Sequence, residues 1–359
     1  MPLITVRPVH RGQFTAIAAV CGLLALAGCG ADAPQVLDPS TVAADVAADK
    51  TAPPAPVIPA TWPLTGVAAG DIVNRPALAV KIENDPSVRP QTGLDEADMV
   101  WEELVEGGVT RFVAVFQSVV PGSVGPVRSV RPMDAGITAP LHGLIAFSGG
   151  QAPFVDAVQA AGVQIISMDR GAAGFARVRG HAAPHNVFGT PSTFWSQADG
   201  DHAASPPAQF AFARTADAAS AAVAGTPVTT LALVFSNQFH PNWAWSAADG
   251  AFLRSEGSTP SRTPAGAALK ATNVVALRVR TASTGTVDPA GNPVPETVMV
   301  DSGEATLVSG GKLVAAKWSK ASTGEPIVLT SAADGSVLKL APGKTWVELV
   351  PPTGSVTAS

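Results

Sequence analysis

Short apolar and β-branched runs recur along the chain from residue 62 onwards, and turn-forming residues separate them. Up to about residue 235 these runs predict strands, and segments between several of them are expected to be helical. An alternation of strands and helices is typical of a mixed α/β domain. The strands are expected at 77–82, 110–118, 144–147, 163–168 and 229–235, and the helices at 127–141 in part, 152–161, 192–197 and 216–223.

One more helix is predicted over 96–106, where a pair of glycines would end it. Helical spacing would place Asp98, Glu102 and Glu106 one above the other on a single face. Apolar residues cover most of the remaining surface of this segment, so the helix is expected to be buried. Like charges stacked in this way repel one another, and the acidic face would need arginine partners or an unusual protonation state.

After Ser236 the pattern changes to short β-rich runs separated by Asp-Gly, Gly-Gly and Pro-Gly turns. Even spacing of this kind predicts a small β-sandwich or barrel-like domain. We therefore expect an α+β protein, in which a mixed α/β N-terminal domain (62–235) precedes a smaller, mostly β C-terminal domain (236–351). The two domains would be separable near Ser236, and residues 352–359 are expected to form a disordered tail.

The first thirty residues have the order of a secretion signal. Basic residues precede an apolar run over 14–26, and a Leu-Ala-Gly-Cys sequence follows that ends at Cys29. The run is shorter than the roughly 20 residues that span a bilayer. Residues 1–29 are therefore expected to be a signal peptide, with a core helix from Phe14 as the alternative. Residues 30–61, rich in Ala, Asp, Pro and Thr, are expected to be a disordered tether.

The sequence before Cys29 resembles the bacterial lipobox. The resemblance implies cleavage before Cys29 and acylation of its thiol, with palmitate as the typical chain. The protein would then be anchored in lipid at the outer face of the bacterial cytoplasmic membrane, in an extracytoplasmic location. Cys21 would leave with the signal peptide, so a disulfide and a cysteine nucleophile are both excluded.

Composition and motifs exclude several other functions. Only 14% of residues are charged and the formal net charge is −5, so nucleic acid is not an expected partner. Neither a phosphate-binding glycine motif nor a Gly-x-Ser-x-Gly motif occurs, and no cofactor is expected. His181 and His185 have the spacing of zinc ligands on a helix, but Pro184 disfavours a helix there, so no metal is expected. His185 and Asn186 are expected to hydrogen-bond a substrate or the protein itself from a loop.

A set of short motifs runs through the chain from residue 84 to residue 346. The motifs are Asn84, Arg89-Pro90-Gln91, Gly93-Leu94, Ala97-Asp98, Glu102-Glu103, Glu106-Gly107-Gly108, Thr110-Arg111, Gly125 to Arg131 (GPVRSVR), Ser148-Gly149-Gly150, Pro184-His185-Asn186, Gly310-Gly311, Lys317-Trp318 and Pro342 to Trp346 (PGKTW). This set is similar to the signature of the YerB-like lipoproteins. The resemblance implies a bacterial envelope lipoprotein with a domain of unknown function and an associated C-terminal domain, and it suggests a role in cell-wall metabolism.

The candidate chemistry is cleavage of peptidoglycan glycan strands, as in a lytic transglycosylase or glycosidase. A glycosidic oxygen leaves only when protonated, and a buried glutamate beside like charges would have its pKa raised toward the working pH. Glu102 is the first candidate for this acid and Glu106 the second, with Asp98 as the neighbour that raises the pKa or orients water. The expected substrate-binding residues are Arg89, Gln91, Arg111, Arg128, Arg131, His185 and Asn186.

Two alternatives stay open. The same acids and arginines would also suit a buried structural ion-pair network, or a non-catalytic lipoprotein that binds the cell wall, a cell-wall enzyme or a ligand and acts as a scaffold. Four tryptophans of the second half are likewise expected either to stack on sugars or, as the more common outcome, to pack in the core: Trp243, Trp245, Trp318 and Trp346.

Overall fold

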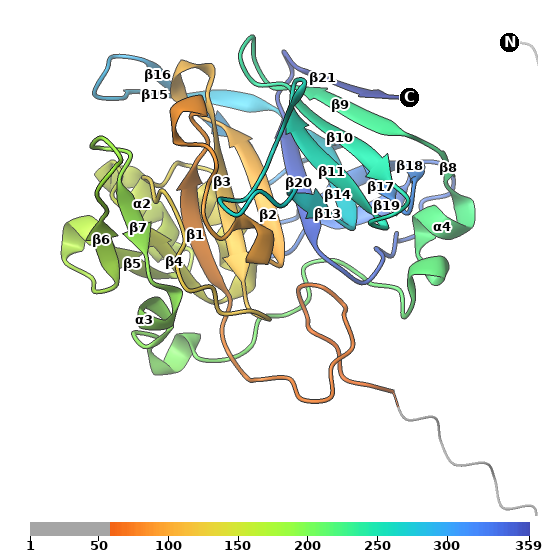
Figure 1. Ribbon diagram of the computed structural model, residues 1–359, viewed down its shortest axis with the longest axis horizontal. Helices are drawn as coiled ribbons and strands as arrows, with labels where there is room; N and C mark the ends of the chain where they lie inside the picture. Colours follow the sequence, from red (N-terminus) through yellow and green to blue (C-terminus); the bar gives the residue numbers. More distant parts are fainter. Residues whose placement is uncertain (1–57) are drawn as a thin grey trace, which may run out of the picture. The chain divides into compact units, whose positions relative to one another are not determined.

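The computed structural model describes residues 58–359, and this part of the chain is rich in strands that form several sheets (Figure 1). The predicted signal peptide, Cys29 and nearly all of the predicted tether lie outside the described residues. Within 58–359 no helix combines the length and the apolar character needed to cross a membrane.

Eleven strands form the larger sheet, in the order β19-β18-β17-β14-β20-β2-β3-β1-β4-β5, with β8 beside β18. Neighbours are antiparallel except at four places: β14 with β20, β20 with β2, β1 with β4, and β4 with β5. The strands are β1 (Leu78–Glu83), β2 (Met99–Leu104), β3 (Thr110–Phe116), β4 (Leu144–Phe147), β5 (Gln164–Ser167), β8 (Thr226–Pro227), β14 (Asn273–Arg278), β17 (Ser302–Ser309), β18 (Lys312–Ser319), β19 (Val328–Ser331) and β20 (Thr345–Val350).

This sheet contains strands from both sides of the predicted boundary near Ser236. The two sets of strands meet where β2 pairs with β20, with Met99 opposite Thr345 and Glu102 opposite Glu348. The boundary itself stays a prediction. Because backbone hydrogen bonds cross it in the middle of a sheet, independent unfolding of the two segments is no longer what we expect.

A six-stranded sheet in the order β12-β11-β10-β9-β21, with β13 beside β11, forms a second layer. Its last strand lies within the segment that we expected to be a disordered tail. The strands are β9 (Thr230–Val234), β10 (Pro241–Ser246), β11 (Ala251–Glu256), β12 (Thr259–Pro260), β13 (Lys270–Ala271) and β21 (Ser355–Ala358). Two separate hairpins pair β6 (Phe175–Arg177) with β7 (Val187–Gly189) and β15 (Thr281–Val287) with β16 (Pro293–Thr297). The α-helices are α1 (Asp134–Thr138), α2 (Ala152–Ala160), α3 (Pro191–Trp195) and α4 (Ser220–Ala224).

The helix predicted over 96–106 is wrong, because its central residues form strand β2. This strand lies between β3 and β20 and is buried on both faces, and such a strand reads as a nearly continuous apolar run without alternation. Gly107, with φ of 68°, turns the chain into β3. The strands predicted at 77–82, 110–118, 144–147 and 163–168 are confirmed by β1, β3, β4 and β5, and the helix at 152–161 by α2.

Successive residues of β2 point to opposite faces of the larger sheet. Met99 and Trp101 belong to a buried cluster that includes residues of α1 and α2, and we call this side the helix face. Val100 belongs to a cluster with Trp243 of β10 and Phe252 of β11, and we call this side the sandwich face. In Figure 1 the strands β9, β10 and β11 lie across β14, β17 and β20, as a sandwich requires.

Candidate functional site

The adjacent acidic residues Glu102 and Glu103 anchor two ionic clusters on opposite faces of β2. Glu102 follows Val100 on the sandwich face, whereas Glu103 follows Trp101 on the helix face. Both side chains are completely buried. Burying a carboxylate is costly unless it is paired or hydrogen-bonded, so each face has to supply partners from other elements.

On the sandwich face both oxygens of Glu102 are engaged. Oε1 accepts hydrogen bonds from the Thr110 hydroxyl at 2.7 Å and from the Asn84 amide at 3.1 Å, and Oε2 accepts one from Arg254 Nη2 at 2.7 Å. The register partner Glu348 accepts a hydrogen bond from Trp243 Nε1 at 2.8 Å. Burial, together with the negative charge of Glu102, raises the pKa of Glu348 well above its usual value.

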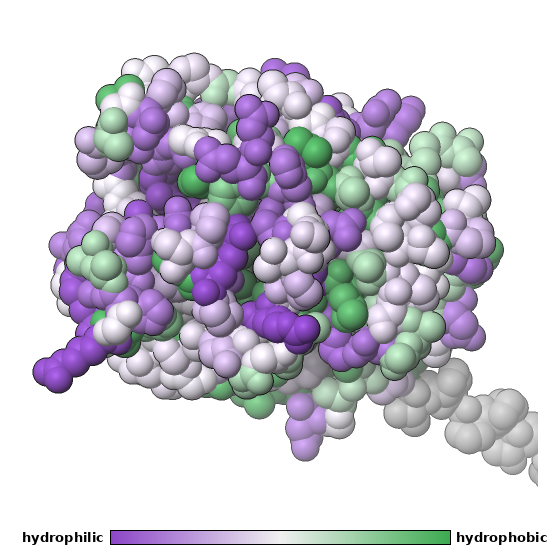
Figure 2. Space-filling view, turned by 45° about the horizontal axis from the view of Figure 1, so that its top comes forward, coloured by the Kyte–Doolittle hydropathy of each residue, from purple (hydrophilic) through white to green (hydrophobic). Residues whose placement is uncertain are grey.

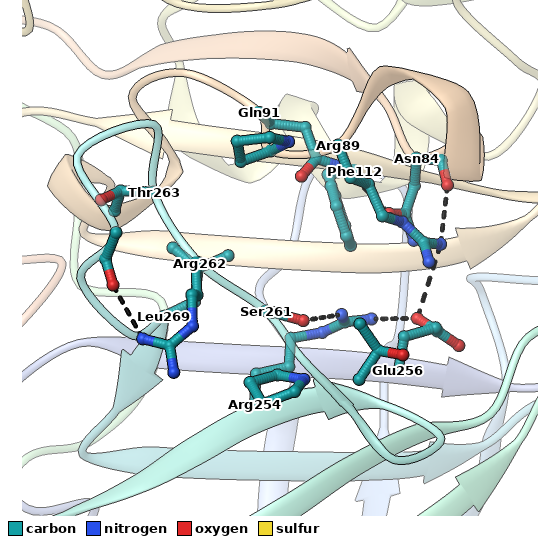
Figure 3. Close-up of a pocket in the computed structure, with 14 residues that line it drawn as sticks. Asn84, Arg89, Gln91, Phe112, Arg254, Glu256, Ser261, Arg262, Thr263 and Leu269 are labelled. Atoms are coloured by element: carbon teal, nitrogen blue, oxygen red, sulfur yellow. Dashed lines mark hydrogen bonds and ion pairs between the residues drawn. The ribbon is translucent and has the colours of Figure 1, made fainter.

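Arg254 and Asn84 also line a cavity of about 320 Å³, which we call the intersheet cavity (Figure 3). In Figure 3, Asn84, Arg89 and Gln91 approach it from one side, and residues of β11 and the segment 259–269 approach it from the other. Asn84 Oδ1 accepts hydrogen bonds from Arg89 Nε at 3.0 Å and from Gln91 Nε2 at 2.9 Å. The predicted binding residues Arg89 and Gln91 are thus brought together here.

On the helix face Lys81 forms ion pairs with Glu103 and with Asp134, the latter at 2.8 Å, and all three side chains are completely buried. Asp134 begins α1 and also accepts a hydrogen bond from the backbone N–H of Arg131 at 2.6 Å. Burial, and after it the charge of Asp134, raise the pKa of Glu103 to about 8.

Beside this cluster lies a second cavity of about 230 Å³, which we call the arginine cavity. Arg131 binds both oxygens of Glu106, and its Nε lies 2.6 Å from Oε2. Arg128 Nε lies 3.1 Å from one oxygen of Glu83. The other oxygen of Glu83 lies 2.9 Å from Nδ1 of the ring of His185. The residues that line the cavity are Glu83, Asp85, Glu106, Gly107, Val109, Thr110, Arg111, Arg128, His185, Asp288 and Asn292.

Arg111 is the cation that lines this cavity without a carboxylate partner among the described residues. The lining carboxylates Asp85 and Asp288 accept hydrogen bonds from Ser87 and Asn292 instead. Its residue is only 7% exposed, and its Nη1 donates to the backbone carbonyl of Ser129 at 2.9 Å. Arg111 lies between Glu83 and Glu103 in strand register, yet in the described part of the chain no carboxylate comes within 4.0 Å of its guanidinium nitrogens. Burial, and then the charge of Arg131, lower the pKa of Arg111 to about 10.

The three predicted catalytic acids are not stacked on successive turns, as a helix would have arranged them. Asp98 precedes β2 and Glu102 lies within it, and extended chain at 3.3 Å per residue separates the two by about 13 Å. Asp98 accepts hydrogen bonds from the backbone N–H groups of Gln117 and Ser118 at 2.6 and 2.8 Å, and burial raises its pKa. Of the three acids, Glu106 alone lines a cavity.

The predicted binding residues divide between the two cavities. Arg111, Arg128 and His185 line the arginine cavity with Arg131 beside it, whereas Arg89 and Gln91 line the intersheet cavity. Asn186 does not join them, because its Oδ1 accepts a hydrogen bond from Arg177 at 2.7 Å. Among residues 58–359 no group of three or more potential metal ligands occurs.

Four charged residues of the clusters were missed in the sequence analysis: Lys81, Asp134, Arg254 and Glu348. Lys81 and Glu348 were visible as single charges inside apolar β runs, which is a signal for a buried ion pair. The tryptophans pack in the core, since Trp243, Trp318 and Trp346 are at most 3% exposed and Trp245 is partly buried against the same core.

Comparisons with known proteins agree with this architecture. Residues 64–204 match the family model described as "Protein of unknown function (DUF3048) N-terminal domain", and residues 231–347 match its C-terminal domain. The chain is 51% identical over 70 residues to the "Putative lipoprotein YerB" of Bacillus subtilis (strain 168). That alignment spans 19% of this chain and 21% of the relative, so about a fifth of the relative's length is matched.

The fold is similar to the crystal structure of the YerB protein from Bacillus subtilis, with a TM-score of 0.68. The alignment covers 83% of this chain and 99% of that one at 23% identity, which is a likeness of fold.

Proposed function

Because this chain belongs to the YerB-like DUF3048 family, whose two domain models match most of it, we propose that it is a lipid-anchored envelope protein that binds a carboxylate-bearing ligand in the arginine cavity. The named relative is described as a lipoprotein, and the lipobox ending at Cys29 supports the same anchor here. One lipid chain alone binds a membrane weakly, so a stable anchor would need a second acyl chain on the modified cysteine.

The observation that carries the proposal is the buried, unpaired guanidinium of Arg111. A buried charge without a counter-ion costs several kcal/mol, and a charged group perturbed by burial at a cavity is a candidate for a functional site. The planar fork of arginine matches the two oxygens of a carboxylate. Arg128 and Arg131 are already paired with Glu83 and Glu106, so their role is to shape the cavity and leave Arg111 for the ligand.

The peptide stems of peptidoglycan, and lactyl groups that carry no stem, are a source of such carboxylates within reach of a protein tethered at the membrane surface. We therefore propose a soluble peptidoglycan fragment as the ligand class. The face in Figure 2 shows hydrophobic residues as small groups among hydrophilic ones, which suits a small polar ligand better than a broad apolar partner surface.

The pKa and the burial of the candidate acids support binding without cleavage rather than catalysis. A general acid for a glycosidic oxygen needs a raised pKa and access to substrate. Burial favours the protonated form of Glu106, but the hydrogen bonds and charge of Arg131 outweigh it and lower the pKa of Glu106. Glu102 is fully buried, has both oxygens engaged and lines neither cavity. Cleavage of glycan strands thus stays the second candidate function.

The test is titration calorimetry of the full-length, detergent-solubilised protein with muropeptides released from sacculi. Loss of a charged hydrogen-bond pair costs roughly 1.5–3 kcal/mol, so Arg111→Gln should weaken binding by about 10- to 150-fold. The melting temperature without ligand should stay the same or rise, because an unpaired buried charge is removed. Arg128→Gln, which breaks a partly exposed pair, is the matched control and should change affinity less.

Intact sacculi incubated with the wild-type protein provide the second readout. We expect no anhydro-sugars and no new reducing ends. Release of either product would favour the catalytic alternative. Equal muropeptide affinity of the wild type and Arg111→Gln would contradict the binding proposal.

A further inference from the structure

We propose that the intersheet cavity is a second ligand site, which takes an uncharged, hydroxyl-bearing ring such as a single sugar residue. This cavity lies on the sandwich face and shares no lining residue with the arginine cavity. The inference therefore does not depend on the function proposed above.

The walls of the cavity are preorganised. Asn84 uses its whole amide: Nδ2 donates to Glu102 and to Thr110, and Oδ1 accepts from Arg89 and Gln91. Arg89 Nη2 also donates to the backbone carbonyl of Asn84 at 2.9 Å. The side chains that face the cavity from this loop are thus held before any ligand arrives, which lowers the entropic cost of binding.

The polar groups left over for a ligand include both acceptors and donors. Gln91 is 96% buried, and Nε2 makes both of its hydrogen bonds, to Asn84 and to the backbone carbonyl of Glu83, so Oε1 has no donor among the described residues. Arg89 bonds through Nε and Nη2, which leaves Nη1 as a donor. Ser261 accepts from Arg254 at 3.0 Å and keeps its own hydroxyl proton. A ligand that both donates and accepts satisfies this set, as hydroxyl groups do.

The buried charges around the cavity compensate one another. Arg254 lies 2.7 Å from Glu102 and 3.1 Å from Glu256, and Arg89 lies 3.6 Å from Glu256. The guanidinium of Arg254 also lies 5.4 Å from the ring centre of Phe112. The arginine cavity has a buried cation without a partner, whereas here each buried cation has one. Arg262, which also lines the cavity, is exposed to solvent and donates to the backbone carbonyl of Gly266 at 2.8 Å. An ionic ligand would unbalance the buried pairs, so the site favours a neutral one.

The remaining wall is apolar, and it fits the C–H faces of a ring. It is formed by Pro90, Phe112, Pro260 and Leu269, the last two from the segment that closes the cavity in Figure 3. The volume of about 320 Å³ is at the lower end of the roughly 300–1,000 Å³ of small-molecule sites, which suits one ring rather than an oligomer.

The test uses saturation-transfer NMR and titration on the full-length protein in detergent. The probes are N-acetylglucosamine, which is neutral, and N-acetylmuramic acid, which adds a lactyl carboxylate to the same ring. We expect saturable binding of the neutral sugar and weaker binding of the acid at this cavity. Leu269→Trp fills the cavity and should abolish the signal of the neutral sugar. Ser261→Ala removes one hydroxyl and should weaken binding by about 2- to 12-fold.

Arg111→Gln in the other cavity is the matched control and should leave binding of the neutral sugar unchanged. Melting temperatures identify any variant that fails to fold, and Ser261→Ala, at a partly exposed position, keeps the test valid if Leu269→Trp does not fold. The proposal is overturned by absence of saturable N-acetylglucosamine binding, by equal binding of Ser261→Ala and the wild type, or by preference of this cavity for the acidic sugar.

Discussion

At the scale of single residues, Glu102 of β2 and its register neighbour Glu348 of β20 are two buried carboxyl groups near one cation, Arg254. Glu102 is bound to Arg254, whereas the pKa of Glu348 is raised by burial and by Glu102. Glu102→Gln leaves Arg254 with Glu256 alone, and we expect a loss of about 3 kcal/mol in the free energy of unfolding, the lower end for a broken buried pair.

Glu348→Gln is the matched control, because it changes an equally buried glutamate at the register position opposite Glu102. The raised pKa of Glu348 favours its protonated carboxyl, and an amide in its place can still accept the hydrogen bond from Trp243, so the loss should stay below about 1 kcal/mol. Urea denaturation of both variants measures the difference. Equal losses would show that Glu348 is ionised in the folded protein.

The raised pKa of Glu103 predicts that the free energy of unfolding depends on pH. Its pKa is about 8 in the folded protein, above the ordinary value of 4.5, so the folded state binds more protons than the unfolded state between these values. The stability from Glu103 is therefore complete below about pH 4.5 and is lost as pH rises toward 8, with a slope of at most about 1.4 kcal/mol per pH unit. Glu103→Gln should flatten this slope in urea titrations between pH 5 and 8, and an unchanged slope would assign it to other groups.

At the scale of elements, the pattern of apolar residues predicted most of the strands but not β2. The runs at 77–82 and 110–118 combine β-branched residues with flanking turns, and both form strands. Met99–Leu104 is buried on both faces, and its acidic residues gave the spacing of a helix face. The local pattern of apolar residues could not show that β20 is the neighbouring strand, because β20 lies more than 200 residues further along the chain.

The candidate site, like the strands, was predicted from the sequence only in part. The arginines and acids of the motifs near β2 and β3 were recognised, and several of them do line one cavity. Arg254 was missed because its partner Glu102 comes from a different part of the chain, and Glu348 was missed because its register neighbour on β2 does too. Arg111 remains unpaired because of distances between elements that are far apart in the sequence. A local sequence pattern carries no information about those distances.

The turn between β2 and β3 gives a prediction about backbone conformation. Gly107 has φ of 68°, and a Cβ there would meet only Asn292 Nδ2 at 4.0 Å. Gly107→Ala should therefore cost only the left-handed backbone strain, about 1–2 kcal/mol. Gly70→Ala, which is exposed, has no atom within 4 Å of the new Cβ and needs no positive φ, should change the melting temperature little. A cost for Gly107→Ala no larger than the control's would contradict this conformation.

At the scale of the whole molecule, the shared sheet predicts that residues 58–359 unfold in one step. Separation after residue 230 would expose β2 on one fragment and β20 on the other, both buried central strands. We expect one calorimetric transition for the full chain and no stable fold for residues 231–359 expressed alone, a fragment that keeps β20 and β21 whole. Two resolved transitions, or a folded 231–359 fragment, would restore the separable domains expected from the sequence.

The parallel pairing of β2 with β20 also sets the order in which the protein can form. Strand β20 begins at Thr345, more than 200 residues after the end of β2 at Leu104. Until it emerges during synthesis, β2 has an unpaired edge and Glu102 has no neighbouring strand on that side, so the central sheet cannot close. Contacts this distant in sequence make folding slow, because a long loop must be closed before they form. A nascent chain of this topology therefore stays open, in the form that a narrow pore can thread, until β20 has been made.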